Sequence, residues 1–288
     1  MTRKMKTVTL NDGNIIPSIG FGTYKATEDE AIAAIKFAVE KGYRLFDTAA
    51  KYENEEVVGA GIRKSGIPRE ALCITTKLWR EELGYNEAKK AFEKSLQLLQ
   101  LGYIDLYLIH WPANARNYDN WQKANADAWK AMEELQADGK IKSIGVSNFF
   151  PPHLDALMQT AKVKPALNQI EFHPGYWQPE VTGYCRQHNI AIEAWSPLAR
   201  GRVFKNPLLQ SLAKKYNKSI SQICLRWIIA HGAIPIPKST TNDRIAENID
   251  VFDFNLTKEE IAAINDLPQM GFSGELPDIW PERLPLID

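Results

Sequence analysis

Eight short β-rich runs recur along this chain, and longer segments with helical periodicity separate them. Most of these runs are nearly continuous stretches of apolar residues, which is typical of strands covered on both faces. Alternation of such strands with helices indicates parallel strands joined by crossover helices. The sequence therefore predicts an α/β fold whose strands lie near residues 18–22, 43–47, 71–77, 103–110, 141–147, 166–171, 190–195 and 233–238.

The segments around these runs carry helix and turn signals. Residues 88–99 repeat apolar side chains at intervals of three and four, as on the buried face of a helix. Two short runs, 7–10 and 14–16, flank an Asp-Gly pair, which predicts a β-hairpin. Capping-box pairs mark the expected starts of three helices at Thr27 with Glu30, Ser219 with Gln222, and Thr257 with Glu260.

Polar residues stand where the apolar runs stop. In a closed barrel of strands and helices the catalytic residues lie at the carboxyl ends of the strands, so this placement favours a barrel. A doubly wound open sheet is the rival, but residues 20–24 lack the third glycine of the dinucleotide fingerprint, and no GxxxxGK[ST] motif occurs. The residues at strand ends are Asp47, Lys77, His110, Ser147, Asn148, Asn168, Gln169, Glu171, Trp195, Ser196 and Lys238.

We therefore expect a (β/α)8 TIM barrel, built as a single domain over residues 1–288. The N-terminal β-hairpin precedes the barrel, and a C-terminal specificity tail follows it. Length alone would allow one domain or two, because about 150 residues per domain is only a prior.

The charge balance and the apolar pattern exclude several classes of partner. The 35 Lys and Arg residues match 35 Asp and Glu residues, so no basic field is available to bind nucleic acid. The start, MTRKMKTVTL, has no apolar h-region, and no run of about 18 apolar residues occurs. We expect no nucleic-acid or membrane partner, and a cytoplasmic location.

Cysteine and histidine spacing points to neither disulfides nor metal. The three cysteines, Cys73, Cys185 and Cys224, are far apart and have apolar neighbours, which indicates reduced thiols in the core. The histidines form no HExxH pattern and no Cys/His ligand spacing. No metal site is expected.

One constellation of residues carries chemistry. The ends of three successive predicted strands, and the loop after the second run, bring Asp47, Tyr52, Lys77 and His110 to the same end of a barrel. A tyrosine ionises near pH 10, so proton transfer near neutrality needs positive charge beside the phenol. Lys77 supplies that charge, Asp47 holds the ammonium, and His110 donates a hydrogen bond to a carbonyl. Taken alone, Asp47 and Lys77 would more often be a structural ion pair, and it is their combination with Tyr52 and His110 that favours a catalytic role.

Several long motifs resemble the aldo-keto reductase family. The family's first signature is similar to GYRLFDTA at 42–49, which continues through Tyr52 to Gly59. Its second signature is similar to LGYIDLYLIHWP at 101–112. IPKSTTNDRIAEN at 236–248 is similar to the third, and GVSNF, NQIEFHP and AWSPLARG match in order. The resemblance implies an NADPH-dependent reductase of aldehydes and ketones, in which Tyr52 is the general acid and Asp47, Lys77 and His110 assist it.

The residues expected at the cofactor also make physical sense. Amide and hydroxyl groups at two adjacent strand ends suit the nicotinamide carboxamide, and the Trp195 ring offers a face for stacking. Lys238 and Arg244 stand beside a helix start, which suits an adenosine 2′-phosphate and favours NADPH over NADH. The resemblance places Glu247 and Asn248 at the adenine. The full cofactor set is Gly22, Thr23, Asp47, Ser147, Asn148, Asn168, Gln169, Trp195, Ser196, Leu198, Lys238, Ser239, Thr240, Arg244, Glu247 and Asn248.

Loops at the catalytic face set the substrate range in barrel enzymes. Three segments are expected to matter here, namely 111–121, 198–206 and the tail 270–288. The short first segment resembles that of bacterial members which accept small dicarbonyls such as methylglyoxal, or keto-sugar acids such as 2,5-diketogluconate. We expect an open, aromatic pocket with a broad range, lined by Tyr24, Trp79, His110, Trp111 and Trp280.

Two other functions remain open at this point. A barrel lyase or isomerase could use Lys77 as a Schiff base, although Tyr52 and the Lys238–Arg244 cluster would then have no purpose. A non-catalytic member could bind NADPH as a sensor or as a subunit, although the intact tetrad argues against it. We expect a monomer, which the resemblance implies and the lack of a heptad seam supports.

Overall fold

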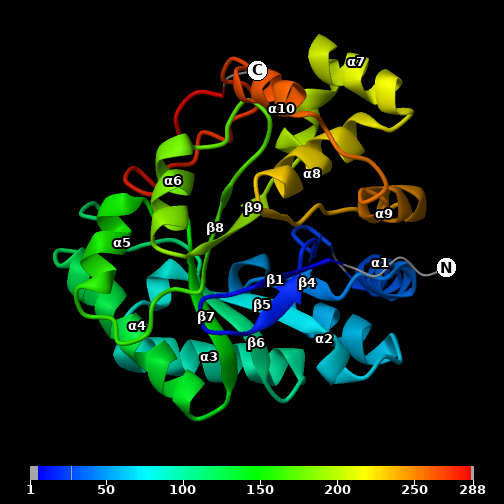
Figure 1. The fold of residues 1–288 in the computed structure, drawn as a ribbon. Coiled ribbons are helices and arrows are strands. Elements are labelled where there is room, and N and C mark those ends of the chain that lie inside the picture. Colours follow the sequence, from blue (N-terminus) through cyan, green and yellow to red (C-terminus); the bar gives the residue numbers. More distant parts are fainter. Residues whose placement is uncertain (1–5, 27, 287–288) are drawn as a thin grey trace.

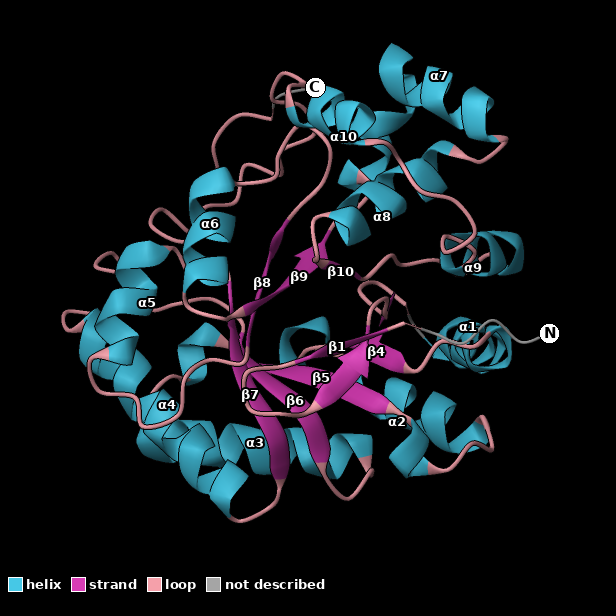
Figure 2. Cartoon of the chain, viewed as in Figure 1, coloured by secondary structure: helices cyan, strands magenta, loops and turns pink. Residues whose placement is uncertain are grey.

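The computed structural model describes residues 6–26 and 28–286. Within that part of the chain, eight parallel strands form one curled sheet in sequential order, from β3 to β10, and helices surround it (Figures 1 and 2). The predicted (β/α)8 fold is therefore confirmed. Its strands are β3 (Phe21–Gly22), β4 (Leu45–Asp47), β5 (Cys73–Leu78), β6 (Ile104–Ile109), β7 (Ile141–Ser147), β8 (Leu167–Glu171), β9 (Ala191–Trp195) and β10 (Ile234–Pro235).

The first and last strands meet through backbone hydrogen bonds. Gly20 N donates to Pro235 O at 2.9 Å, and Gly22 N donates to Pro237 O at 3.1 Å. This approach requires glycine, because a Cβ on Gly22 would lie 2.9 Å from the Ile236 carbonyl oxygen. The prolines lack an N–H, which explains why β10 is shorter than predicted. The sheet nevertheless closes into a barrel.

Helices follow the strands and cover the outside of the sheet (Figure 2). Two of the three predicted capping boxes form, at Ser219 with Gln222 and at Thr257 with Glu260. The third includes Thr27, which lies outside the described residues. None of the described helices is long and apolar enough to cross a membrane. The helices are α1 (Glu28–Lys41), α2 (Glu55–Lys64), α3 (Tyr85–Leu99), α4 (Trp121–Ala137), α5 (Pro151–Met158), α6 (Pro179–Gln187), α7 (Pro207–Tyr216), α8 (Ile220–Ala230), α9 (Asn242–Ile249) and α10 (Lys258–Asn265).

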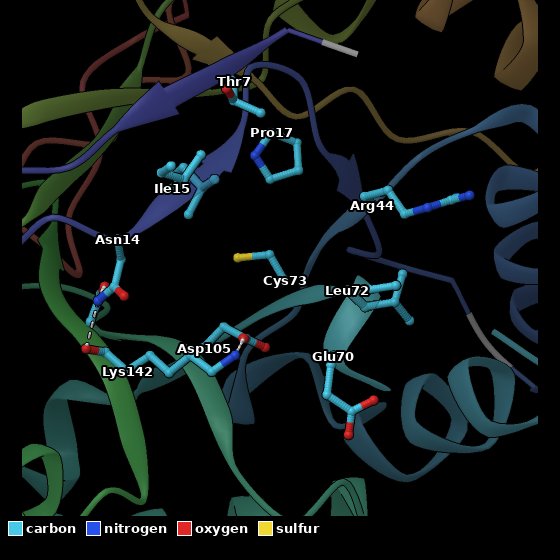
Figure 3. A pocket seen from close by; sticks show the side chains of 13 residues that line it. Thr7, Asn14, Ile15, Pro17, Arg44, Glu70, Leu72, Cys73, Asp105 and Lys142 are labelled. Atoms are coloured by element: carbon cyan, nitrogen blue, oxygen red, sulfur yellow. Dashed lines mark hydrogen bonds and ion pairs between the residues drawn. The ribbon is translucent and has the colours of Figure 1, made fainter. Parts of the chain in front are cut away.

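The predicted N-terminal hairpin covers the amino end of the barrel. Its strands, β1 (Thr7–Thr9) and β2 (Ile15–Pro17), pair antiparallel. Asn14 Nδ2 bonds the Lys142 carbonyl oxygen at 3.1 Å, which ties the hairpin to the start of β7. A cavity of about 310 Å³ lies beneath it (Figure 3). Cys73 lines this cavity, and burial raises the pKa of its thiol well above the usual value. The predicted catalytic residues do not line this cavity.

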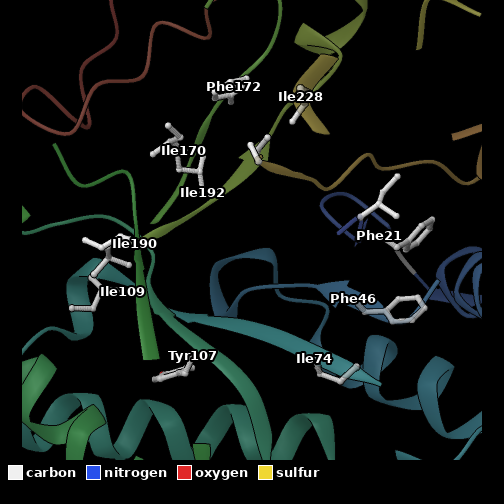
Figure 4. Close-up of a cluster of buried hydrophobic side chains, with 14 of the residues drawn as sticks. Phe21, Phe46, Ile74, Tyr107, Ile109, Ile170, Phe172, Ile190, Ile192 and Ile228 are labelled. Carbon is white, nitrogen blue, oxygen red and sulfur yellow. The ribbon is translucent and has the colours of Figure 1, made fainter. Parts of the chain in front are cut away.

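Two apolar layers hold the barrel. Outward-facing strand residues pack against the helices, as Tyr107, Ile170 and Ile192 illustrate (Figure 4). Inward-facing residues such as Leu108 and Leu167 form a second cluster with the hairpin. Each fully buried large apolar side chain contributes about 1.5–3 kcal/mol. Cys73, Cys185 and Cys224 are buried and free, as predicted.

Candidate active site

The carboxyl ends of the strands open into a cavity of about 660 Å³. Asp47 ends β4, Tyr52 closes the 3-10 turn Ala50–Tyr52, and His110 follows β6. Lys77, near the end of β5, lies behind Asp47 rather than on the cavity wall. The structure therefore brings the predicted tetrad to one place, at the end of the barrel opposite the hairpin.

Asp47 and Lys77 form a fully buried ion pair. Lys77 Nζ lies 2.7 Å from both carboxylate oxygens of Asp47, and it also donates to the Thr48 carbonyl oxygen at 2.8 Å. Lys77 is 0% exposed, and Asp47 is 2% exposed. Charge-assisted hydrogen bonds in such surroundings are short and directional. The ammonium is thereby fixed beneath Tyr52, with its nitrogen 5.0 Å from the centre of that ring.

Tyr52 stands over this ion pair and is only partly exposed to the cavity. Exclusion of water from its hydroxyl raises the pKa of Tyr52 well above the usual value, and the negative charge of Asp47 adds to the effect. Positive charge from Lys77 was expected to lower this pKa, whereas burial and Asp47 raise it. Tyr52 is thus a neutral phenol that holds its proton.

His110 lies edge-on to Tyr52, with 5.5 Å between the ring centres. Burial, together with the charge of Lys77, lowers the pKa of His110 well below its usual value. Its Nδ1 is buried and has no hydrogen-bond partner among the described residues. A neutral imidazole carries one N–H donor. His110 can therefore donate a hydrogen bond without competing as an acid.

Next to the tetrad, amide and hydroxyl side chains line the cavity wall. Asn148 Nδ2 donates to the His110 carbonyl oxygen at 3.0 Å, and Trp195 Nε1 donates to Asn148 Oδ1 at 2.8 Å. Gln169 and Ser147 also reach the cavity. The remaining predicted wall residues found on this lining are Gly22, Ser196, Leu198 and Lys238.

Two residues predicted at the cofactor face the protein instead. Asn168 Nδ2 donates to the Phe149 carbonyl oxygen at 2.8 Å, and this side chain is 0% exposed. Thr23 is buried as well, and its hydroxyl donates to the Asp47 carbonyl oxygen at 2.8 Å. Neither lines the cavity. Both side chains instead bond to backbone carbonyl groups next to the cavity, and so help to fix the backbone there.

The cluster predicted for the 2′-phosphate continues outward from Lys238. Ser239 Oγ accepts from Thr241 N at 3.1 Å, which shapes the turn before α9. Arg244 lies in the first half of α9 and is exposed, whereas Asn248 is buried. Thr240 is half-buried, and the Glu247 carboxylate accepts a hydrogen bond from the Ser219 hydroxyl. These residues lie outside the cavity lining itself.

Aromatic rings line the end of the cavity beside His110 and Tyr52. Trp79 contacts both His110, at 5.2 Å between ring centres, and Trp280, at 5.4 Å. Trp111 lies 6.3 Å from Trp280, and the exposed Tyr24 ring lies 4.9 Å from Tyr52. All four predicted aromatic residues therefore line the cavity together.

The C-terminal tail supplies one side of this aromatic end. Glu171, at the end of β8, accepts from Ser273 N at 3.0 Å and from Ser273 Oγ at 2.7 Å. The Arg80 guanidinium lies 3.3 Å from the centre of the Trp280 ring. Sequence reasoning missed the charged residues on the cavity lining, because no sequence pattern shows which surface side chains turn towards a cavity. They are Lys25, Lys51, Arg200, Glu275 and Arg283.

Glu193, in the middle of β9, is a further buried carboxyl group that sequence reasoning missed. Its signal was a single acidic residue inside an otherwise apolar run. The side chain is 0% exposed, and burial raises the pKa of Glu193 to about 8, with the negative charge of Asp47 adding to the shift. Lys77 opposes this effect, as does a hydrogen bond from Gln169. When it is ionised, Glu193 also raises the pKa values of Tyr52 and Cys73.

The free energy of unfolding is expected to fall as pH rises from about 4.5 towards about 8. The folded protein keeps the Glu193 proton over this range, whereas the unfolded chain releases it at the ordinary value of 4.5. The contribution of Glu193 to the free energy of unfolding is complete below its unfolded pKa and is lost as pH rises through its folded pKa. It amounts to a few kcal/mol. Denaturant unfolding at several pH values measures this slope. Glu193→Gln should flatten it, and equal slopes in both proteins would contradict the assignment.

Comparison with known proteins identifies the family. Residues 18–268 match the Aldo/keto reductase family. A glyoxal reductase from Bacillus subtilis (strain 168) is 47% identical over 273 residues, which cover 94% of this chain and 96% of the relative. Methylglyoxal reductase DkgA from Escherichia coli (strain K12) is 45% identical over 273 residues, with the same coverage of 94% and 96%.

Solved structures agree with this match. The crystal structure of Bombyx mori aldo-keto reductase in complex with NADP has a TM-score of 0.84 to this chain. The two are 41% identical, over 91% of this chain and 92% of that one. Family match, relatives and fold agree over most of the length, and the chain belongs to the aldo/keto reductase family.

Proposed function

We propose that this protein reduces small aldehydes and ketones to alcohols with NADPH, and that Tyr52 supplies the proton. One observation carries the proposal. Tyr52, which holds its proton, lies beside the neutral His110 ring at a cavity, directly above the buried Asp47–Lys77 ion pair. A proton donor and a hydrogen-bond donor thus face the same space, where a carbonyl oxygen would need both.

The residues along the cavity fit NADPH. Gln169 and Asn148 present polar groups beside the tetrad, and the half-buried Trp195 ring offers an apolar face. Lys238 also lies on this lining, just before the start of α9. A cation beside a helix start suits a phosphate. We propose that the nicotinamide lies beside Gln169 and Trp195, and that Lys238 and Arg244 bind the 2′-phosphate.

The protein's own part in the reaction is positioning and proton transfer. Bound NADPH supplies the hydride that adds to the carbonyl carbon. His110 donates its N–H to the carbonyl oxygen and orients it, and Tyr52 delivers its proton to the same oxygen as negative charge develops there. The Lys77 ammonium, held by Asp47, then stabilises the phenolate that remains on Tyr52.

We propose small dicarbonyls as the preferred substrates. The relatives named glyoxal reductase and methylglyoxal reductase support this choice, and so does the aromatic end of the cavity. Lys51, whose ammonium lies 5.4 Å from the centre of the Trp79 ring, and Arg283 add positive charge to the lining, so keto-sugar acids remain a second class to test. The test is a panel of aldehydes, ketones, dicarbonyls and keto-sugar acids, followed by the loss of near-ultraviolet NADPH absorbance. The highest kcat/KM is expected for dicarbonyls; activity on simple aldehydes alone would contradict this.

The Schiff-base alternative is disfavoured by the surroundings of Lys77. Its ammonium is 0% exposed and already bonded to Asp47 and to the Thr48 carbonyl oxygen. A substrate carbon would have to displace both partners before it could reach the nitrogen. The non-catalytic alternative gives no reason for a proton donor to be kept at the cavity.

Arg244→Ala is expected to weaken NADPH binding roughly 10- to 100-fold, because a charge-assisted hydrogen bond contributes about 1.5–3 kcal/mol. NADH has no 2′-phosphate, so its dissociation constant should stay within about twofold. Quenching of tryptophan fluorescence measures both constants. Lys90→Ala, which removes an exposed cation on α3, is the matched control and should change neither. Equal losses for the two cofactors would contradict the role of Arg244.

We also propose that the protein is a monomeric, single-domain enzyme of the cytoplasm without a nucleic-acid partner. The zero net charge supports the last point. The continuous barrel order from β3 to β10 supports one domain. Light scattering coupled to size-exclusion chromatography should give one chain's mass, and a dimer's mass would contradict the monomer.

A further inference from the structure

Glu193 and Gln169 are neighbours across two strands inside the barrel. In the parallel pairing of β8 and β9 they stand in register, so both side chains project to the same side of the sheet. Gln169 Nε2 donates to Glu193 Oε2 and, at 2.8 Å, to Asp47 Oδ2. Asp47 in turn holds Lys77. A continuous polar network thus joins β5, β4, β8 and β9 beneath the cavity.

The two carboxyl groups determine which way the Gln169 amide faces. An amide nitrogen has two hydrogens, and here each one has an acceptor. The reverse orientation would bring the amide oxygen against the Asp47 carboxylate and would lose the bond to Oδ2. The nitrogen therefore faces inward, which leaves the Gln169 carbonyl oxygen as the group presented to the cavity.

We propose that Glu193 is a positioning residue, which fixes the Gln169 carboxamide so that its carbonyl oxygen accepts a hydrogen bond from the nicotinamide carboxamide. This inference rests on the proposed use of NADPH. The orientation of the nicotinamide ring then depends in part on Glu193, which lies outside the cavity lining and does not touch cofactor or substrate.

Glu193 is poorly suited to a purely structural role. Ile234, which stands in register with Glu193, belongs to an apolar cluster with Leu108 and Leu167. Its second oxygen, Oε1, is buried without a hydrogen-bond partner among the described residues. A buried polar atom of this kind is destabilising, and an apolar side chain would avoid it. What only Glu193 provides is the acceptor for Gln169, and Oε2 can accept whether the carboxyl group is ionised or neutral.

Four variants test this inference. Glu193→Leu replaces the acceptor with an apolar side chain of similar size, and Glu193→Gln keeps an acceptor in a group that cannot ionise. Gln169→Ala removes the group that Glu193 holds, and the double variant Gln169→Ala/Glu193→Leu tests whether the two act together. Glu55→Leu is the matched control, since Glu55 is another buried carboxyl group, bonded to Thr76 rather than to Gln169.

Three quantities are measured for each variant. They are the NADPH dissociation constant from tryptophan fluorescence quenching, the thermal unfolding midpoint, and the changes in KM for NADPH and in kcat, which are compared with each other. Glu193→Leu should weaken NADPH binding roughly 5- to 10-fold, the size of one lost hydrogen bond, with KM rising more than kcat falls. Glu193→Gln should stay within about twofold of the wild type. In the Gln169→Ala background, Glu193→Leu should cause no further loss.

Three results would overturn the inference. The first is an unchanged NADPH affinity in Glu193→Leu, even if its unfolding midpoint moves. The second is a loss of NADPH affinity in Glu193→Gln as large as that in Glu193→Leu. The third is that Glu193→Leu weakens NADPH binding just as much when Gln169 has been replaced by alanine. If Glu193→Leu fails to fold, Glu193→Gln and Gln169→Ala keep the inference falsifiable, because weak NADPH binding in the first or normal binding in the second would overturn it. Failure of the proposed function looks different, since the wild type itself would then bind no NADPH, and both proposals would fall.

Discussion

Tyr52→Phe is expected to lower kcat for carbonyl reduction by about 10²- to 10⁴-fold, the usual contribution of a positioned general acid. The substitution removes only the hydroxyl, so the ring keeps its contacts with Tyr24 and His110. The neutral His110 ring has no acidic proton with which to replace it. Steady-state kinetics with methylglyoxal measure the loss, and the NADPH dissociation constant should stay within about twofold.

The matched control for this experiment is Tyr184→Phe. Tyr184 lies on α6, and its hydroxyl donates to the exposed Asp155 carboxylate, far along the chain from the tetrad. Removing that hydroxyl should leave kcat unchanged. Activity that survives in Tyr52→Phe would show that another group donates the proton.

Lys77→Met is expected to destabilise the fold by about 3–5 kcal/mol, the usual effect of removing one partner from a buried ion pair. The variant leaves Asp47 buried without its cation, and Glu193 nearby adds a second carboxyl group. It should also reduce kcat, because nothing then stabilises the Tyr52 phenolate. Denaturant unfolding measures the first effect, and steady-state kinetics measure the second.

Two comparisons separate the causes of that destabilisation. Lys89→Ala breaks an exposed ion pair with Glu134 and should change the free energy of unfolding far less. Adding Asp47→Asn to Lys77→Met removes the unpaired charge and should restore part of the stability, but not the activity. Lys77→Met with wild-type stability would contradict the description of the pair as a buried, mutually dependent unit.

The barrel and the tetrad could be predicted because both depend on local patterns. Strand β7 covers the predicted residues 141–147, since its apolar run ends sharply at a Ser-Asn pair. Parallel strands place their carboxyl ends at one edge, so polar residues at those ends had to meet. The cavity lining accordingly contains Asp47, His110, Gln169 and Trp195.

Other features depend on contacts that no local pattern reveals. Asn168 and Gln169 are adjacent at the end of one strand, but successive side chains point to opposite faces, so only Gln169 reaches the cavity. Glu193 gains its role from Gln169 on β8 and Asp47 on β4, which are distant in sequence. The charged pair of Glu275 and Arg283 on the cavity lining lies in the C-terminal tail, whose path depends on the finished barrel.

The most direct test of the central claim is a count of products against cofactor. Purified protein is mixed with NADPH and methylglyoxal, and the NADPH oxidised is compared with the alcohol formed. Carbonyl reduction by hydride transfer predicts one alcohol for each NADPH consumed, and Tyr52→Phe should consume almost none under the same conditions. No consumption of NADPH with methylglyoxal, or with any other aldehyde or ketone of the panel, would contradict the assignment of this protein as a carbonyl reductase.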